Sequence, residues 1–425
     1  MRRRTAAALV ALLAVLLSLT LGAGRAFADG EDVHGRLVDN GTALANVRIV
    51  VTTPDDKPVG DVRTGPDGAW VVPLPGAGTY KISLDTSTLP AGEKLTNPDL
   101  ATVTKDVIGG QQKPQLFPVG GGTPTKVFHD DTNRTAQLIA EGLRFGLILS
   151  LAAVGLSLIY GTTGLVNFSH GELVTYGALI AYWLNVTHGL QIIGAGALAV
   201  AICGATGWAQ DALFWGRLRK RGTGLLAMMI ASIGLALLVR YIFLYFYGGD
   251  NDAYTDYRGQ VAIKPGPLPI ALAPRDYWSM GIAVVALVLT LVALNRTKLG
   301  KATRAVSDNP ALAAASGIDV NRVIRTVWTV GAALAGLAGI LLGLAQQVQF
   351  QMGQNILLLI FAAVTLGGLG TALGAVAGSL VIGVGIQVST LWVSPELKNV
   401  CALGALIVIL MVRPQGILGL RERIG

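Results

Sequence analysis

The stretch "LILSLAAVGLSLIYGTTGLVNFSHGELVTYGALIAYWL", Leu147–Leu184, decides the fold. Its two outer parts are apolar enough to lie in lipid as helices. Between them, the segment "GLVNFSHGE" carries four polar side chains: Asn167, Ser169, His170 and Glu172. Ionisable groups inside a membrane helix are costly and usually face the bundle interior or a water-filled path. The stretch therefore predicts a helical membrane protein with a functional polar break.

The composition agrees with this prediction. Of the 425 residues, 52% are hydrophobic and only 14% are charged, and 55 are glycines. A mean hydropathy of +0.57 is typical of a polytopic membrane protein. We expect an all-α polytopic membrane domain of about eight or nine transmembrane helices over residues 138–425. The candidate spans are 138–160, 164–186, 192–215, 223–247, 277–295, 326–346, 354–367, 371–392 and 397–413, of which 354–367 is short enough to be a half-helix.

The first 137 residues differ in character. Residues 1–28 combine an arginine-rich start, an apolar run and an A-x-A site, which predicts a cleaved signal peptide, with an uncleaved helix as the alternative. Residues 29–113 alternate short strand-like runs with turns such as Pro66-Asp67-Gly68. We expect a small exported all-β sandwich there, with Val47, Ile49 and Val51 on its buried face. Residues 114–137, rich in Gly and Pro, are interpreted as a linker.

Basic residues predict the orientation of the helices. Positive charge collects in cytoplasmic connections. One set of loops and the tail holds thirteen Lys and Arg: Arg217, Arg219, Lys220, Arg221, Arg296, Lys298, Lys301, Arg304, Arg322, Arg325, Arg413, Arg421 and Arg423. The opposite set holds only Arg258, Lys264, Arg275 and Lys398. We therefore expect a multi-pass protein of the cell (inner) membrane, with the β-sandwich outside and the C-terminus in the cytoplasm.

The polar break Gly164–Glu172 is the first candidate site. The expected topology places it near the cytoplasmic end of the first helical hairpin. We therefore interpret Asn167, Ser169, His170 and Glu172 as the lining or gate of a translocation path on the inner side. The alternative is structural: Asn167 and Ser169 tie helices together, and Glu172 lies among the lipid headgroups.

The second candidate is the segment "KATRAVSDNPALAAASGIDVNRV", Lys301–Val323. Asn309 can cap a short helix that has Pro310 at its first position and ends at Gly317. A short capped helix beside basic side chains such as Arg304 is suited to docking a cytoplasmic partner. A solvated connecting loop is the alternative.

The third candidate is a row of glycines in "LGGLGTALGAVAGSLVIGVG", residues 366–385. Gly367, Gly370, Gly374 and Gly378 recur at three- and four-residue spacing, the pattern that brings membrane helices into close contact. We interpret them as helix-packing residues, with a mobile gate as the alternative.

Several classes of function lack their motifs. No G-x-x-x-x-G-K-[ST] sequence occurs, so we expect ATP to be bound by a different chain. The histidines offer no zinc-binding spacing, and Ser169 beside His170 is not a catalytic dyad. The acidic balance of residues 29–137 offers no nucleic-acid patch. We expect no catalytic residues, no metal and no cofactor.

Four separated motifs carry a family resemblance: "GLSLIYGTTGLVNFSHGELVTYGALIA", "RAVSDNPALAAASGIDVNRVI", "TLGGLGTALGAVAGSLVIG" and "RPQGILG". Together they resemble the permease subunit of branched-chain amino acid ABC importers over about residues 138–420. The order of elements in residues 29–113 resembles the carboxypeptidase-regulatory-like β-sandwich. The second resemblance implies a fold and no activity.

The permease resemblance implies a set of partners. These are a homologous second permease, two cytoplasmic ATPases, an external solute-binding protein and the lipid bilayer. It also implies that Arg304, Asp308, Asn309, Pro310 and Gly317 belong to an ATPase-coupling loop. Urea or a short amide is the alternative substrate, since the same family contains such permeases. A membrane-anchored receptor that binds the cell envelope is the alternative from another class.

Overall fold

The computed structural model describes residues 32–39, 42–76, 78–95, 101–107, 112–115, 117, 119, 131–249, 251–256, 260, 262–263, 270–393, 400, 404, 407 and 411. The chain divides into two compact units: Met1–His129 with Tyr257–Ile263, and Asp130–Asp256 with Lys264–Gly425. Each unit has its own hydrophobic core. The predicted signal peptide, and the ninth span except for its residues 400, 404, 407 and 411, lie outside the described residues.

The first unit is a small β domain. Its strands are β1 (Asp32–Arg36), β2 (Val38–Asp39), β3 (Thr42–Ala43), β4 (Arg48–Thr52), β5 (Pro58–Arg63), β6 (Ala69–Pro73), β7 (Gly78–Leu84), β8 (Thr102–Val107) and β9 (Gln112–Pro114). They form three sheets, in the orders β5-β4-β7-β8, β6-β1-β9 and β2-β3. A single apolar cluster draws side chains from both larger sheets, including Ile49 and Ile82 from one and Val33 and Val72 from the other. The β domain predicted before the helices is therefore present.

Local sequence explains how this domain is connected. In β4, Ile49 and Val51 are buried while their neighbours are half-buried, which is the predicted alternation. The turn between β5 and β6 falls at Pro66-Asp67-Gly68, where Gly68 has a φ of 78° and Gly65 donates to the Ala69 carbonyl at 2.8 Å. A positive φ favours glycine, so this residue fixes the turn.

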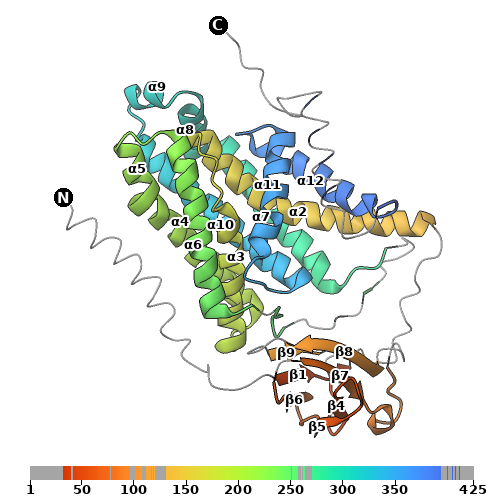
Figure 1. Cartoon of the computed structure of the whole chain (residues 1–425). Helices are drawn as coiled ribbons and strands as arrows, with labels where there is room; N and C mark the ends of the chain where they lie inside the picture. Colours follow the sequence, from red (N-terminus) through yellow and green to blue (C-terminus); the bar gives the residue numbers. More distant parts are fainter. Residues whose placement is uncertain are drawn as a thin grey trace, which may run out of the picture. The chain divides into compact units, whose positions relative to one another are not determined.

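The second unit is helical (Figure 1). Its helices are α2 (Asp131–Thr163), α3 (His170–Tyr182), η3 (Trp183–Thr187), α4 (Ile192–Gln210), η4 (Asp211–Trp215), α5 (Gly216–Lys220), α6 (Leu225–Tyr247), α7 (Pro274–Arg296), α8 (Lys298–Asp308), α9 (Pro310–Ala315), α10 (Val320–Gln346), α11 (Met352–Gly367) and α12 (Ala372–Ser389). Within the described residues, six helices are long and apolar enough to cross a membrane. The predicted polytopic fold is confirmed.

Three predicted boundaries need correction. The second span was expected to begin as a helix at residue 164, but residues 164–167 are not helical and α3 begins at His170. The expected linker 114–137 ends inside α2, which already begins at Asp131. The third span continues through the π-helical turn η4 to Lys220. Hydropathy detects apolar residues, whereas helix starts depend on hydrogen bonds that it does not report.

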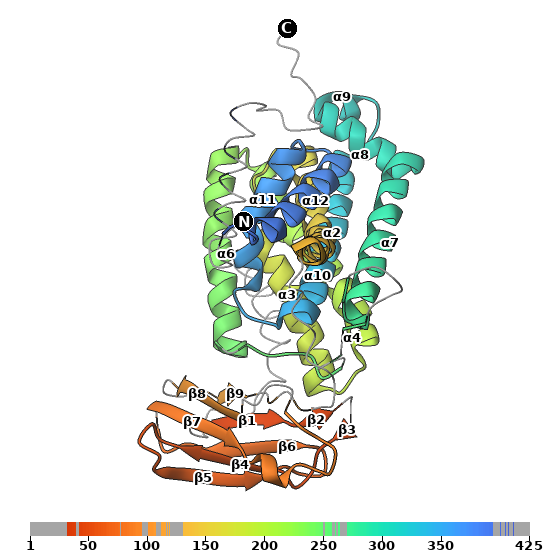
Figure 2. The same ribbon diagram turned by 90° about the vertical axis from the view of Figure 1, so that its right-hand side faces the viewer.

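Paired glycines allow the central helices to pack backbone to backbone. An added Cβ on Gly177 of α3 would collide with the backbone of Gly336 on α10, and one on Gly155 of α2 would lie 3.2 Å from the Cα of Gly331. Helices approach this closely only where side chains are absent. By contrast, α6 and α7 lie on opposite sides of the bundle (Figure 2), and few of their residues are buried.

Two ends of the helical unit are used below as landmarks. The α9 end carries α8 and α9, which lie together beyond the long helices (Figure 1). The Asp252 end is marked by an antiparallel bridge in which Asp252 and Val348 exchange backbone hydrogen bonds of 3.0 and 2.6 Å. Helix α6 begins beside Gly164 at the α9 end and stops at Tyr247 near the Asp252 end, where the Tyr247 hydroxyl donates to the Val348 carbonyl at 3.2 Å.

Candidate functional site

The chain between α2 and α3 is a non-helical segment inside the helical unit. Gly164, with a φ of 68°, ends α2 and donates to the Tyr160 carbonyl at 2.7 Å. The Asn167 side-chain oxygen then accepts hydrogen bonds from the backbone N–H of Ser169 at 3.1 Å and from its hydroxyl at 2.7 Å. This local turn competes with helix formation and places the start of α3 at His170.

Three contacts with α6 show how far along that helix the segment between α2 and α3 extends. Gly164 lies beside Leu225, Phe168 donates from its backbone N–H to the Ser232 hydroxyl at 3.0 Å, and Glu172 meets Arg240. Leu225 and Arg240 are separated by about 22 Å of helix at 1.5 Å per residue. The start of α3 therefore lies deep in the bundle, farther from the α9 end than its place after α2 implied.

A buried ion pair lies at this depth. Arg240 donates from Nε at 3.0 Å and from Nη2 at 2.6 Å to Oε1 of Glu172. The same Nη2 donates to Oε1 of Gln354 at 2.6 Å. The Glu172 side chain is 3% exposed and that of Arg240 is 16% exposed. We call Glu172, Arg240 and Gln354 the polar cluster; it joins α3, α6 and α11.

Helix α11 also begins inside the unit, next to this cluster. An added Cβ on Gly171 would lie 2.8 Å from the Gly353 carbonyl oxygen, and Gly353 donates from its N–H to the Thr175 hydroxyl at 3.0 Å. The starts of α3 and α11 are therefore neighbours. Helix N-termini carry partial positive charge, and interrupted membrane helices of this kind form polar sites in transporters.

The other polar side chains of the break face different neighbours. His170 is fully buried, and its Nε2 lies 2.9 Å from the Ala152 carbonyl of α2. Within the described residues, Asn167 Nδ2, His170 Nδ1 and Glu172 Oε2 are buried without a hydrogen-bond partner. Unpaired buried polar atoms are rare and call for an explanation. The structure thus brings Glu172 to the polar cluster but turns His170 toward α2.

The predicted coupling segment forms the helices α8 and α9. Asn309 accepts a hydrogen bond from the Leu312 N–H at 3.0 Å, Pro310 is the first residue of α9, and Gly317 has a φ of 85°. The predicted cap, start and stop of this helix are confirmed. Arg304, Asp308, Asn309, Pro310 and Gly317 are all exposed. Leu312 is an exposed apolar side chain on the same helix, 66% accessible.

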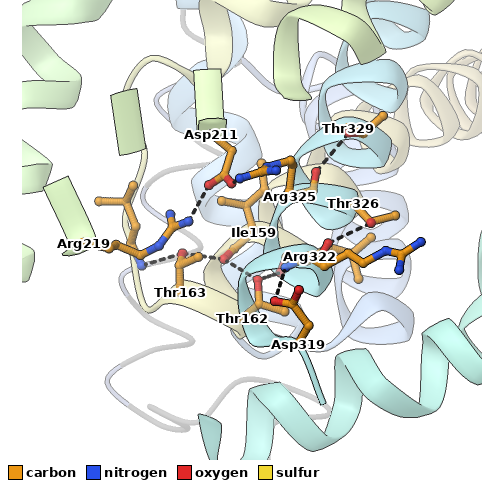
Figure 3. Close-up of polar contacts among 12 residues, drawn as sticks. Ile159, Thr162, Thr163, Asp211, Arg219, Asp319, Arg322, Arg325, Thr326 and Thr329 are labelled. Atoms are coloured by element: carbon orange, nitrogen blue, oxygen red, sulfur yellow. Dashed lines mark hydrogen bonds and ion pairs between the residues drawn. The ribbon is translucent and has the colours of Figure 1, made fainter. Parts of the chain in front are cut away.

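Two contacts tie this segment to the long helices. The Ser307 hydroxyl of α8 donates to the Gly161 carbonyl of α2 at 2.7 Å, just before the break. Asp319 then caps α10 by accepting from the Arg322 N–H at 3.0 Å. One turn later, Arg325 lies 3.7 Å from the Asp211 carboxylate, which also accepts from Arg219 at 2.6 Å (Figure 3).

An open cleft of about 1030 Å³ lies between α8 and the end of α2. Arg304, Ser307 and Asp308 line one side of it, and Gly161 and Gly370 line another. Gly164, the first residue of the polar break, also lines this cleft, so the coupling segment and the start of the break border the same space at the α9 end.

The candidate packing glycines lie where α11 meets α12. Added Cβ atoms on Gly367 and Gly374 would each collide with the backbone of the other, and one on Gly378 would collide with the Ala363 carbonyl. Gly370 differs from these three: it has a φ of 81° in the turn between the helices and lies against Gly161.

Residues 138–411 match the family described as "Branched-chain amino acid transport system / permease component". The chain belongs to this permease family. It is 27% identical over 303 residues to the "High-affinity branched-chain amino acid transport system permease protein LivH" of Escherichia coli (strain K12), covering 67% of this chain and 96% of that protein. It is 30% identical over 305 residues to the corresponding BraD protein of Pseudomonas aeruginosa, with the same coverage of 67% and 96%. The "Ribose import permease protein RbsC" of Escherichia coli (strain K12) is 28% identical over 244 residues, covering 55% and 72%.

Sequence reasoning missed two members of the permease's polar cluster. Arg240 is the only charged residue in α6, a run of 23 residues, and a lone arginine in so apolar a run is itself a functional signal. Gln354 has no comparable signal, because a glutamine near the start of a short helix is unremarkable. Asp211 was also missed, since it follows the apolar run of α4 without an obvious partner nearby in sequence.

Proposed function

We propose that this permease is the membrane subunit of an ATP-driven importer for branched-chain amino acids. The observation that carries the proposal is the match to LivH and BraD, which extends over 96% of the length of each relative. A permease of this class performs no covalent chemistry. It exposes a substrate site first to one side of the membrane and then to the other.

The proposed assembly contains a second homologous permease, two cytoplasmic ATPases and an external solute-binding protein. The α9 end faces the cytoplasm, because α5 carries Arg217, Arg219 and Lys220 there and basic residues collect on the cytoplasmic side. The β domain is then outside. The exposed apolar faces of α6 and α7 are suited to contact with lipid or with the second permease.

The ATPase docks on α8 and α9. This contact is supported by the exposed Leu312, which gives an apolar anchor on a capped, rigid helix, and by exposed charges such as Arg304 around it. Ser307 links the docking helices to the end of α2, and Asp319 and Arg325 link them to α10 and α4. A displacement of α9 therefore has two physical routes into the bundle.

Uptake by the complete assembly tests this function. Proteoliposomes containing the permease, its ATPases and its binding protein should take up labelled leucine in the presence of ATP and should stop when ATP is depleted. Labelled urea and labelled ribose should remain outside. ATP-dependent uptake of urea or ribose in place of leucine would contradict the proposed substrate.

A deletion tests the docking site. Removal of Pro310–Ser316 should abolish co-purification of the ATPases while the permease remains in the membrane. ATPase binding at the wild-type level after this deletion would contradict the assignment. Removal of residues 29–120 serves as the second arm, since uptake that persists without them excludes a receptor that uses the helices only as an anchor.

A further inference from the structure

The ion pair of the polar cluster lies well inside a long helix, where burying two charges costs free energy. Two other ion pairs of the helical unit each have one member at a helix end: Asp276 is the third residue of α7, and Arg219 is in the last turn of α5. Arg240 lies fifteen residues after the start of α6 and seven before its end. A buried ion pair contributes little net stability compared with apolar packing, so folding alone does not account for its presence here.

The cluster also has unused binding capacity. Both hydrogen bonds from Arg240 to Glu172 end on Oε1, and within the described residues Oε2 of Glu172 is buried with no partner. A buried carboxylate oxygen without a donor is satisfied well by an ammonium group. The Arg240 guanidinium has five N–H donors in a planar fork, the geometry that matches a carboxylate.

The starts of two helices add a favourable field for an anion. Glu172 is in the first turn of α3, and Gln354 is in the first turn of α11. The partial positive charge of such termini stabilises a carboxylate, here beside Arg240. The neighbourhood therefore offers one acceptor for a cationic group and a cationic fork for an anionic group, a few ångströms apart.

Aromatic pairs lie on both sides of the cluster. Toward the α9 end, the rings of Phe168 and Phe361 are 5.1 Å apart. Phe168 is level with Ser232, two turns of α6 before Arg240, and Phe361 is two turns of α11 beyond Gln354. Apolar rings that meet between the break and α11 are suited to form a barrier to a charged solute on this side.

Two further pairs lie toward the Asp252 end. Tyr176 stacks on Phe243 at 6.2 Å, and Tyr182 meets Tyr247 edge to face at 5.2 Å. The Tyr182 hydroxyl donates to the Asp252 carboxylate at 3.0 Å, which fixes the second pair to the bridge at that end. The polar cluster is thus enclosed between aromatic layers, an arrangement suited to a site that opens to one side at a time.

We infer that Glu172, Arg240 and Gln354 bind the zwitterionic backbone of the transported amino acid. The ammonium group of the substrate lies at Oε2 of Glu172, and its carboxylate takes over donors of Arg240 now given to Glu172 and Gln354. In the absence of substrate, the ion pair satisfies both charges. This inference deepens the proposed function and rests on it, because a neutral solute such as urea or ribose carries no charged groups to match the two charges of the pair.

Neutralisation of both charges tests the inference. The double variant Glu172→Gln and Arg240→Gln leaves no unpaired charge, so it should reach the membrane and retain its ATPases. Its leucine uptake at saturating binding protein should fall at least tenfold. The matched control is Arg144→Gln with Asp276→Asn, which removes an equally short ion pair of 2.6 Å elsewhere in the bundle and should retain uptake within about twofold.

A conservative variant tests the inference if the double variant does not fold. Arg240→Lys keeps the charge but loses the fork, so its leucine kcat should fall several-fold at normal membrane abundance. Uptake at the wild-type rate in the double variant, or in Arg240→Lys where the double variant does not accumulate, would overturn the inference. An equal loss in the Arg144 and Asp276 control would also overturn it. Failure of the wild-type assembly to carry leucine would instead overturn the proposed function.

Discussion

Arg219 donates to the Asp211 carboxylate at 2.6 Å across the π-helical turn that joins α4 to α5. Asp211 is only 1% exposed, and Arg325 of α10 approaches its other oxygen (Figure 3). One acid therefore connects the hairpin after α4 with the first turns of the helix that follows the coupling segment.

Replacement of this acid should destabilise the permease. Asp211→Asn leaves two arginines without their anion. Breaking a fully buried pair costs about 3 to 5 kcal/mol. The cost here should be lower, because both arginines can reach solvent. We expect a lower melting temperature in detergent and reduced leucine uptake. Asp308→Asn, a change at an exposed acid of α8, is the control and should leave the melting temperature unchanged; equal melting of the two variants would contradict the prediction.

The glycine contact beside the polar cluster should be similarly intolerant. An added Cβ on Gly353 would collide with the Gly171 backbone, so Gly353→Ala must push α11 away from α3. We expect loss of membrane abundance, since overpacking costs typically about 1 to 3 kcal/mol. The control is Gly234→Ala in α6, where an added Cβ meets nothing within 4 Å. Alanine favours the helix there, and its abundance should match or exceed that of the wild type.

The exposed leucine of α9 provides a sharper test of ATPase docking than a deletion. Leu312→Asp should leave the fold intact, because the side chain is exposed, but should remove an apolar anchor and place a charge in the interface. Co-purified ATPase should fall at least tenfold. Val71→Asp, the same kind of change at an exposed position of β6, is the control. Equal ATPase recovery from both variants would show that α9 is not the contact.

The parts of the fold that depend on local chemistry could be predicted from the sequence. Asn309, Pro310 and Gly317 define the limits of α9 by capping and backbone conformation, and apolar runs located most of the long helices. The start of α3 could not be predicted. Residues 164–167 are apolar enough for a helix, and the non-helical segment is held by α6, where Phe168 donates to Ser232, a partner 64 residues away in sequence.

The candidate site, like the fold, could be predicted from the sequence only in part. Glu172 was identified because a charge within an apolar stretch is conspicuous, but its partners Arg240 and Gln354 come from two other helices. Sequence spacing carries no information on contacts between helices. From the sequence alone, Glu172 was therefore expected near the cytoplasmic side. Its contact with Arg240, which lies fifteen residues after the start of α6, places it deep in the bundle.

Truncation of one aromatic layer should convert the importer into a leak, which tests the enclosure of the polar cluster. Phe361→Ala removes one ring of the pair with Phe168, which we infer to be a barrier between the cluster and the α9 end. Proteoliposomes loaded with labelled leucine should then lose it several-fold faster without ATP than wild-type vesicles do. The control is Phe246→Ala, which truncates an exposed ring of α6 and should leave efflux unchanged. If both variants retain leucine as the wild type does, the Phe168 and Phe361 contact is not a barrier, and the path to the α9 end must be closed elsewhere.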